Sequence, residues 1–527
     1  MLATVNSATL HGLDGRHIRV EVDVAPGLPG FTIVGLADAA LQEARERVRG
    51  ALRNAGFTHP ARRITVNLAP AELRKAGASL DLAIAVGVLL GSEQVAPGPG
   101  RPALVGELSL GAEVRAMPGI LPMVAVLARR GIRRVLVPAD ALDEARLVDG
   151  IDCVGVASLA EAVGAIRSPR SRRRVVPPGR VDLGQAGRAG TPDLTGATDR
   201  LGADPPHWPD LAEVRGQAEA RRALEVAVAG GHAMLLVGPP GAGKTLLART
   251  IPGLLPPLDD AAALSATVIA SVAGGEPIRS LVRRPPFRAP HHTTSFAAMV
   301  GGGPRLVPGD VTRADGGVLF LDELAEFNRD VLEALREPLE EGRVAISRVG
   351  RAQTFPARFQ LVAAMNPCPC GMAGTDGGGC RCPQTVVDRY ASRVSGALRD
   401  RIDLWVSMPR LAPAALVDRR EPEDSATVGA RVAAARACQL ARPPGLLNAR
   451  VAGRALRSIA GLDAKGRRRL VELAEVEQLS GRGTERLVRV ARTIADLDGR
   501  RFVGVEDLEE AARYRAFDAR AATRLAV

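Results

Sequence analysis

Eight consecutive residues have the types and the order of a phosphate-binding loop: Gly238, Pro239, Pro240, Gly241, Ala242, Gly243, Lys244 and Thr245. The apolar residues 233–237 before this loop are typical of a strand, and residues 246–250 after it are typical of a helix. In that context, backbone N–H groups and the positive end of the helix bind the β-phosphate of a nucleotide. We expect Lys244 to reach the β- and γ-phosphates and Thr245 to offer its hydroxyl to Mg²⁺.

A second apolar run, residues 316–321, ends in two adjacent carboxylates, Asp322 and Glu323. At the end of a strand beside the phosphate loop, Asp322 would hold the Mg²⁺ shell. Glu323 would orient and deprotonate the water that attacks the γ-phosphate. The two motifs together predict hydrolysis of ATP as well as its binding.

Two polar residues that follow are candidates for contact with the γ-phosphate. Asn366 ends a third apolar run, residues 359–365, and its amide can bind the γ-phosphate or the attacking water; the alternative is an amide that only caps the strand. Arg401 lies in an arginine-rich segment, and an arginine there can supply positive charge to the transition state of a neighbouring subunit. The alternative for Arg401 is a surface ion pair with Asp400 or Asp403.

Four of the six cysteines form two close pairs, Cys368 with Cys370 and Cys380 with Cys382, on either side of a glycine-rich segment. Four thiolates on such a loop can close a tetrahedral zinc site. One intervening residue in each pair is fewer than the two to four that are usual in zinc sites. Structural Zn²⁺ and free thiols flanking Asn366 are therefore both compatible with this spacing.

Composition indicates a globular protein of two to four domains, since the 527 residues are 46% hydrophobic and 24% charged. No apolar run approaches the ~20 residues that span a bilayer, and the first residues lack the pattern of a secretion signal. We therefore expect a cytoplasmic protein without a membrane partner. Cysteine usage does not suggest an extracellular disulfide framework, and Cys153 and Cys438 are expected to be core residues.

The charge balance favours a polyanionic partner. The net charge is +12 and the isoelectric point is near 10.4, and basic side chains that neutralise phosphates are the main source of non-specific affinity for nucleic acid. Part of this charge lies in residues 167–174, inside a predicted linker. Because only 3% of residues are aromatic, a surface that stacks bases on aromatic rings is not expected.

Hydrophobic periodicity predicts an α/β fold class and four segments along the chain. Residues 1–166 alternate strands (17–24, 63–68, 135–138) with helices (39–55, 80–90, 121–130, 159–166). Residues 167–210 are rich in Pro, Gly and Arg and form a linker. Residues 211–410 form the nucleotide-binding α/β core with a parallel sheet. Residues 425–527 form a helical lid with helices at 426–440, 452–459, 466–478, 484–497 and 505–514.

One helix of the lid opens with arginines. Arg482 stands at its start, where it can fold back onto the phosphates, and Arg486 competes with it for this role.

Taken together, these motifs resemble the magnesium-chelatase-like AAA+ ATPases, and most closely the ComM family of bacterial competence proteins. The resemblance covers nearly the whole chain and rests on segments more specific than the phosphate loop. They are residues 214–217 (Val-Arg-Gly-Gln), 230–241, 288–293 (Arg-Ala-Pro-His-His-Thr), 335–340, 366–371 (Asn-Pro-Cys-Pro-Cys-Gly) and 490–496.

The resemblance implies a homo-hexameric ring that binds ATP between subunits and drives branch migration or helicase activity on DNA during recombination. It implies that Arg401 acts on the neighbouring subunit and Arg482 from the lid. It also places two segments, residues 271–310 and 344–355, toward a central pore. Their arginines are candidates for phosphate contacts, with a solvated basic face as the alternative: Arg279, Arg283, Arg284, Arg288, Arg305, Arg348 and Arg351.

The first 166 residues resemble the Lon-protease α/β fold. The segment from Lys75 to Ser79 falls where that fold carries its serine nucleophile, but Leu121 stands at the position of the catalytic lysine. A serine without its base is a poor nucleophile, so this domain is expected not to be proteolytic. Two other functions share the ATPase core: the motor subunit of a metal chelatase and a Lon-like ATP-dependent unfoldase or protease.

Overall fold

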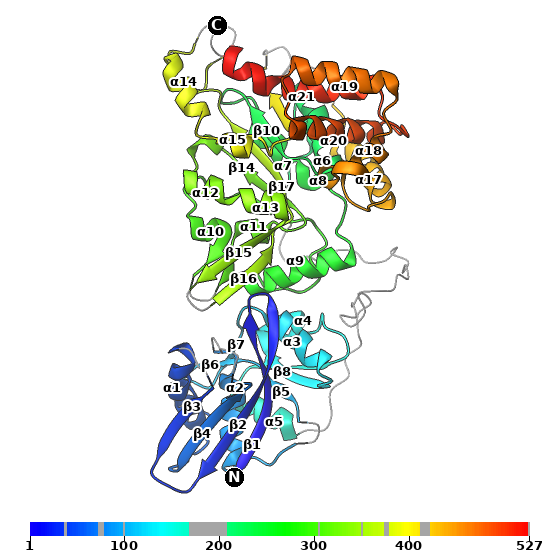
Figure 1. Ribbon diagram of the computed structural model, residues 1–527. Coiled ribbons are helices and arrows are strands. Elements are labelled where there is room, and N and C mark those ends of the chain that lie inside the picture. The colour runs from blue at the N-terminus through cyan, green and yellow to red at the C-terminus, as the bar shows by residue number, and fades with distance from the viewer. Residues whose placement is uncertain are drawn as a thin grey trace. The chain divides into compact units, whose positions relative to one another are not determined.

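The computed structural model describes residues 1–35, 39–71, 78–98, 101–167, 208–303, 306–348, 351–373, 379–411 and 422–524. The chain forms two compact units (Figure 1). Unit 1 contains residues 1–204 together with 259–283 and 303–308, and unit 2 contains 205–258, 284–302 and 309–527. Most of the predicted linker, 167–210, lies outside the described residues.

Unit 1 is built on a seven-stranded sheet with the order β3-β4-β2-β1-β5-β8-β9. Strands β1 and β2 form an antiparallel hairpin, β2 and β4 are also antiparallel, and the other neighbours are parallel. From Ile18 to Val24, alternate residues of β2 are buried, as its period of two predicts. The strands are β1 (Leu2–His11), β2 (Asp14–Ala25), β3 (Gly30–Val34), β4 (Arg63–Ala69), β5 (Ala103–Leu104), β8 (Arg134–Pro138) and β9 (Asp152–Val156).

Helices and a small hairpin complete unit 1, and the predicted helices all form within one or two residues of the expected bounds. Helix α2 is buried along almost its whole length, which explains its continuous apolar sequence. The helices are α1 (Ala39–Asn54), α2 (Asp81–Gly91), α3 (Ile120–Arg129), α4 (Leu142–Ala145) and α5 (Leu159–Arg167), and the hairpin is β6 (Glu107–Leu108) with β7 (Val114–Arg115).

Helix α9 (Asp260–Ala273) belongs to unit 1 although its residues lie inside the range 211–410 predicted for the ATPase core. Leu264 and Val268 pack against the apolar cluster around α3. The Ser271 hydroxyl donates to Glu144 Oε1 at 2.5 Å, and the backbone carbonyl oxygen of Ser271 accepts from the Gly119 N–H at 2.9 Å. Burial raises the pKa of the Glu144 carboxyl, and its bond with Ser271 opposes that rise. The chain thus leaves unit 2 to add a helix to unit 1.

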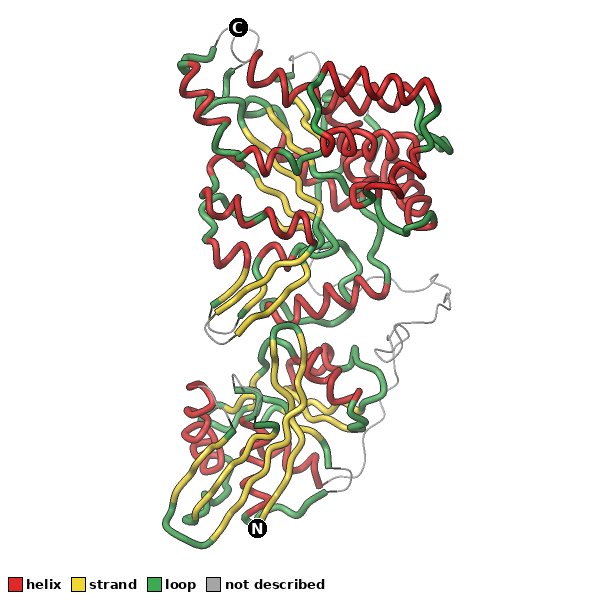
Figure 2. Tube along the Cα trace, in the orientation of Figure 1, coloured by secondary structure: helices red, strands yellow, loops and turns green. Residues whose placement is uncertain are grey.

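Unit 2 contains a five-stranded sheet with the order β11-β14-β17-β10-β18, and all neighbouring strands in it are parallel. Its strands are drawn in yellow in Figure 2. Every residue of β10, β14 and β17 is buried, as expected for parallel strands covered on both faces. The predicted runs at 233–237, 316–321 and 359–365 therefore form the centre of this sheet. The strands are β10 (Met234–Val237), β11 (Phe287–Arg288), β14 (Val318–Leu321), β17 (Gln360–Met365) and β18 (Leu404–Ser407).

The other elements of unit 2 include helices, the short strand β12 (Gly301–Gly302) and one long hairpin. In this hairpin β15 (Arg343–Arg348) pairs antiparallel with β16 (Arg351–Pro356). The helices include α6 (Ala218–Gly230), α7 (Lys244–Arg249), α8 (Ile251–Leu254), α10 (Phe296–Val300), α11 (Asp310–Arg313), α12 (Arg329–Ala334), α13 (Arg336–Glu341), α14 (Gln384–Ala391), α15 (Gly396–Arg399), α17 (Ser425–Ala441), α18 (Gly453–Ala460), α19 (Ala464–Val476), α20 (Gly481–Leu497) and α21 (Val505–Arg524). The five predicted lid helices correspond to α17–α21.

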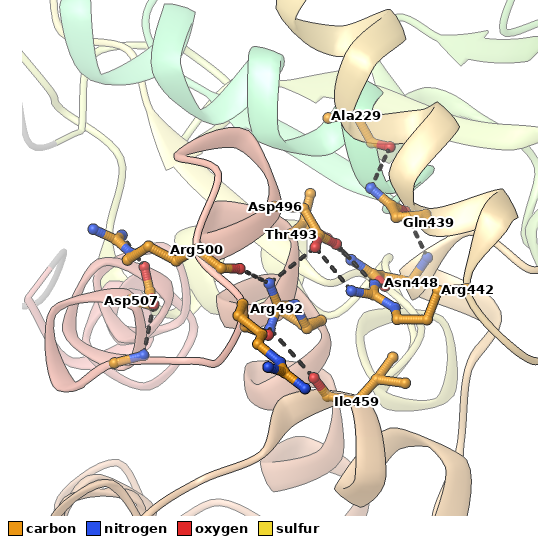
Figure 3. Close-up of polar contacts among 12 residues, drawn as sticks. Ala229, Gln439, Arg442, Asn448, Ile459, Arg492, Thr493, Asp496, Arg500 and Asp507 are labelled. Atoms are coloured by element: carbon orange, nitrogen blue, oxygen red, sulfur yellow. Dashed lines mark hydrogen bonds and ion pairs between the residues drawn. The ribbon is translucent and has the colours of Figure 1, made fainter.

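The lid helices share one hydrophobic core with the sheet of unit 2. A buried polar network also ties the lid helices to one another (Figure 3). Arg492 is fully buried and donates to Asp496 Oδ1 at 2.9 Å and to the backbone carbonyls of Ile459 and Arg500. Asp496 also accepts from Arg442, so one carboxylate is shared by two guanidinium groups. The segment 490–496 is thus structural, since it ties α20 to its neighbours.

Candidate nucleotide-binding site

The predicted phosphate loop connects β10 to α7, so the strand, turn and helix that the motif requires are all present. Gly243 precedes the helix with φ of +89°, a left-handed conformation that favours glycine. Gly238 lies so close to Met408, the residue directly after β18, that a Cβ atom at Gly238 would be 2.2 Å from the Met408 carbonyl oxygen. Both glycines are therefore needed to shape the loop.

Lys244 is buried and its ammonium group has three acceptors. The Nζ atom donates to the carbonyl oxygens of Gly238 at 2.7 Å and Pro239 at 3.0 Å, and to Asn366 Oδ1 at 3.1 Å. Burial lowers the pKa of Lys244, while the carboxylates of Asp322 and Glu323 oppose that shift. This contact brings Asn366, the expected partner of the γ-phosphate or the attacking water, to the phosphate loop.

Thr245 and Asp322, the two residues expected to bind Mg²⁺, contact each other. Thr245 donates its hydroxyl to Asp322 Oδ2 at 2.6 Å, from the start of α7 to the end of β14. Hydroxyl and carboxylate oxygens are ligands that Mg²⁺ prefers, so these residues fit the ion that the motif implies. Bound with ATP, Mg²⁺ supplies charge neutralisation at the phosphates.

Glu323 lies beside this pair with an unusual backbone. Its φ is +53°, a left-handed conformation that is uncommon for a residue with a side chain. Its carboxylate is half-exposed, and Glu323 Oε2 lies 3.1 Å from His292 Nδ1. His292 belongs to the segment 288–293, which follows β11 at the same end of the sheet. A histidine is thus in contact with the expected general base.

Gln217, which is not part of the phosphate loop, holds that loop in place by hydrogen bonds. It has φ of +51° and is buried, and its Nε2 donates to the carbonyl oxygens of Ala242 at 3.2 Å and Pro409 at 2.7 Å. Gln217 is the last residue of the Val-Arg-Gly-Gln segment, and these bonds give that segment a physical role. It holds the loop to the residues that follow β18.

The two predicted arginines lie in different environments. Arg401 is largely buried and binds Glu340 and the carbonyl oxygen of Ala397, so its ion pair is made with a residue distant in sequence instead of Asp400 or Asp403. Arg482 is exposed at the first turn of α20. Arg486, one turn later, is buried and lies 3.7 Å from Asp400 Oδ1. Their roles toward ATP stay predictions.

Some of the arginines expected to bind DNA take part in ion pairs. Arg283 pairs with Asp260 at 2.5 Å, and Arg288 pairs with Asp310 at 2.9 Å. Arg279 and Arg284 are exposed. Arg305 and the side chains of Arg348 and Arg351 lie outside the described residues.

The cysteines divide into a cluster and two single residues. The sulfur atoms of Cys368, Cys370, Cys380 and Cys382 all lie within 4.8 Å of one another. Cys153 is buried as predicted, but the prediction for Cys438 was wrong, because this side chain is exposed. The buried face of α17 is formed by Val428, Val432, Ala435 and Gln439, and Cys438 lies one position outside that stripe.

In unit 1, Ser79 is buried at 5% exposure, and Leu121 is fully buried in the cluster around α3. Lys75 lies outside the described residues. A leucine packed in a core has no group that accepts a proton, so Leu121 offers Ser79 no base.

Comparison with known families covers most of the chain. Residues 210–416 match the family described as magnesium chelatase, subunit ChlI, and residues 20–141 match subunit ChlI of magnesium chelatase. Residues 422–515 match the C-terminal part of the same subunit. Competence protein ComM of Haemophilus influenzae is 38% identical over 98% of this chain and 97% of its own length. The chain belongs to the ComM/YifB-like magnesium-chelatase family.

Other relatives also match this chain over nearly its whole length. The protein YifB of Escherichia coli K12 is 40% identical over 98% of this chain and 97% of its own, and an uncharacterized protein of Mycobacterium tuberculosis is 44% identical over 98% of both. Membership confirms the α/β fold with an AAA+ core, a parallel sheet and a helical C-terminal region, and it supports an ATPase that uses ATP and Mg²⁺. Among the described residues, no helix is long and apolar enough to cross a membrane.

The structure adds two residues to the site that sequence reasoning did not assign. His292 contacts Glu323, and Gln217 holds the phosphate loop. Both lie in segments singled out for their resemblance to the family, 288–293 and 214–217. That signal marked the segments but gave no role to either residue.

Proposed function

We propose that this protein is an ATP-hydrolysing motor that assembles as a homo-hexamer and moves single-stranded or branched DNA, promoting branch migration during recombination in the cytoplasm. One observation carries the hydrolytic part: the ends of β10, β14 and β17 bring the phosphate loop, a paired threonine and aspartate, a glutamate and an asparagine together. This is the set of groups that positioning and electrostatic catalysis of phosphoryl transfer require.

Each group has a defined task in this proposal. Lys244 neutralises charge on the β- and γ-phosphates, and Glu323 takes the proton of the attacking water. Asn366, which already binds Lys244 Nζ, orients the water or the γ-phosphate. Arg401 must leave Glu340 to reach the ATP of a neighbouring subunit, and Arg482 approaches from the lid.

The DNA partner is supported by charge and by relatives. The net charge is +12, and exposed arginines such as Arg279 and Arg284 lie in the segment expected to face DNA. A relative that matches this chain over nearly its whole length is a competence protein. Basic surface attracts a polyanion whatever its sequence, which suits a motor that moves along DNA.

Hydrolysis and strand movement on a synthetic three-strand DNA junction test this proposal. Lys244→Ala removes the phosphate ligand and Glu323→Gln removes the base; both should abolish junction-stimulated hydrolysis and strand movement. Lys465→Ala is the matched control, because Lys465 is an exposed lysine on α19, away from the phosphate loop.

Two results would separate the competing functions. Wild-type hydrolysis that no DNA stimulates, with no strand movement, would overturn the DNA motor and favour the motor subunit of a metal chelatase. Degradation of an unfolded protein substrate that depends on ATP would favour the unfoldase or protease instead.

A further inference from the structure

The four clustered cysteines have the spacing of ligands around one metal ion. Cys368 Sγ lies 3.3 Å from Cys370 Sγ and 3.7 Å from Cys380 Sγ, and the sulfurs of Cys370 and Cys380 are 3.7 Å apart. Ligands about 2.3 Å from a tetrahedral zinc ion are about 3.8 Å apart, whereas a disulfide needs about 2.0 Å. All four cysteines are free, with sulfurs at metal-site distances.

The surroundings of the cluster suit a structural metal. Cys368 is fully buried with Ala373 and Val387, and the partly buried Cys380 and Cys382 pack against them. The backbone N–H of Ala373 points to Cys368 Sγ at 3.3 Å. A donor of this kind stabilises a thiolate and orients it toward a metal. All four ligand positions are protein sulfurs, which is the closed arrangement of a structural site.

The cluster also lies directly beside the ATP site. Cys368 follows Asn366 by two residues, and Asn366 binds Lys244. The turn from Cys368 to Gly371 is closed by a bond from Gly371 N–H to the Cys368 carbonyl oxygen at 2.9 Å. A Cβ atom at Gly371 would lie 2.5 Å from Pro240 Cδ, so this turn touches the phosphate loop.

We propose that Cys368, Cys370, Cys380 and Cys382 bind one structural Zn²⁺ ion, which holds the turn after β17 against the phosphate loop and thereby positions Asn366. Binding takes one proton from each thiol and releases it to solvent, with no change of oxidation state. The metal site itself stands independently of DNA movement; only its effect on ATP rests on the proposed function.

A single zinc ion fits better than an iron–sulfur cluster. In a four-iron cluster each cysteine binds a different iron, which spreads the sulfurs farther apart than around one ion. Tetrahedral tetrathiolate sites bind zinc or a single iron, and zinc adds no redox chemistry. Absorbance distinguishes them, since zinc thiolates are colourless and iron thiolates are not.

Metal analysis of the full-length chain, purified without a histidine tag, tests the site. We expect about one zinc ion per chain and, after exchange into Co²⁺, the absorption of tetrahedral cobalt thiolate. Cys370→Ser and Cys382→Ser should lose most of the metal, whereas Cys438→Ser, an exposed cysteine outside the cluster, should keep it. Wild-type protein that contains no zinc and gives no cobalt spectrum would overturn the proposal, as would equal loss in Cys438→Ser.

Binding of ATP to the demetallated chain tests the positioning role. A chelator should weaken binding of a fluorescent ATP analogue several-fold, and added Zn²⁺ should restore it. Unchanged affinity after complete removal of zinc would refute the positioning role. Because these measurements use no DNA and no hydrolysis, their outcome is separate from the fate of the motor proposal.

Discussion

His292 Nδ1 lies 3.1 Å from Oε2 of Glu323, the residue expected to activate the attacking water. The histidine comes from the segment that follows β11, which pairs in parallel with β14, the strand that ends before Glu323. A carboxylate oxygen engaged by an imidazole has less capacity to accept a proton from water. The contact therefore restrains Glu323 while it persists.

Removing this restraint should raise hydrolysis in the absence of DNA. One net hydrogen bond is worth about 1 kcal/mol, so His292→Ala is expected to increase the basal rate about five-fold and to reduce the ratio of stimulated to basal hydrolysis. Steady-state ATPase rates with and without the DNA junction measure both quantities.

His291→Ala is the matched control for this experiment. His291 is exposed and its Nδ1 contacts Thr293 Oγ1 at 2.9 Å instead of Glu323. Its rates should stay close to those of the wild type. His292→Ala could instead lose as much basal activity as Glu323→Gln. That result would show that the histidine orients the glutamate for catalysis, and it would contradict the proposed restraint of Glu323 by His292.

Gly371→Ala is expected to weaken ATP binding. The residue has φ of +80°, and a new Cβ atom would lie 2.5 Å from Pro240 Cδ, so the phosphate loop or the turn must shift. Left-handed alanine alone costs about 1–2 kcal/mol. Gly379→Ala is the control in the same segment, because its Cβ would meet only Met372 at 3.8 Å. Titration with a fluorescent ATP analogue compares the two variants, and equal affinities would contradict the contact.

Local patterns were sufficient to predict most elements and the residues that meet at the centre of the candidate nucleotide-binding site. The strands before Lys244, Asp322 and Asn366 are buried on both faces, and such strands have continuous apolar sequences that are visible without a structure. Parallel strands bring their carboxyl ends to one edge, so residues after those strands meet. The bonds of Lys244 with Asn366 and of Thr245 with Asp322 follow from that geometry.

Contacts between distant segments were not predictable in the same way. The apolar side chains Leu264 and Val268 of α9 show that the helix has a buried face, but their types do not say which core receives it. The partner of Arg401 is Glu340, and many carboxylates in the chain offer the same chemistry. Cys438 shows a different limit, because one step along a helix turns a side chain about 100° from the buried face.

A buried carboxylate in unit 1 predicts a dependence of stability on pH. Asp81 is fully buried against Arg47, with Arg47 Nε 2.6 Å from Asp81 Oδ2. Burial raises the pKa of Asp81 to about 6, from 3.8, despite the bond with Arg47. Since the folded pKa is the higher one, the contribution of this group is complete below pH 3.8 and is lost as pH rises through about 6.

Comparison with Asp81→Asn isolates this effect. The stability of the wild type relative to Asp81→Asn should fall by on the order of 2–3 kcal/mol between pH 4 and pH 7. Cys153 is the only cysteine in the sequence of unit 1 and is buried, so its labelling by a pyridyl disulfide reports opening of that unit. Taking the ratio of the two labelling rates at each pH cancels the reactivity of the thiol itself. A ratio that is constant across this range would show that Asp81 does not titrate as stated.

Thr493 should be important for the joint between the lid and the sheet of unit 2. It is fully buried on α20, and its Oγ1 lies 2.8 Å from His232 Nε2 and accepts from Asn448 Nδ2 at 3.0 Å. His232 Nδ1 in turn contacts Asp403 Oδ2 at 3.2 Å, and Asp403 is the residue directly before β18. Thr493→Val keeps the side-chain shape but leaves His232 Nε2 without this partner in a buried position. An unsatisfied buried polar group costs about 1–3 kcal/mol.

The two tryptophans make this loss measurable, because Trp208 and Trp405 both belong to unit 2. Their fluorescence during urea unfolding should show a lower midpoint for Thr493→Val than for the wild type. Thr484→Val is the control on the same helix, since Thr484 is only half-buried and its hydroxyl donates to the Ser480 carbonyl oxygen. If both variants unfold at the wild-type midpoint, the His232 contact contributes nothing to the joint. If the urea midpoint of Thr484→Val falls as far as that of Thr493→Val, the loss of stability comes from placing valine in the helix and not from breaking the buried network.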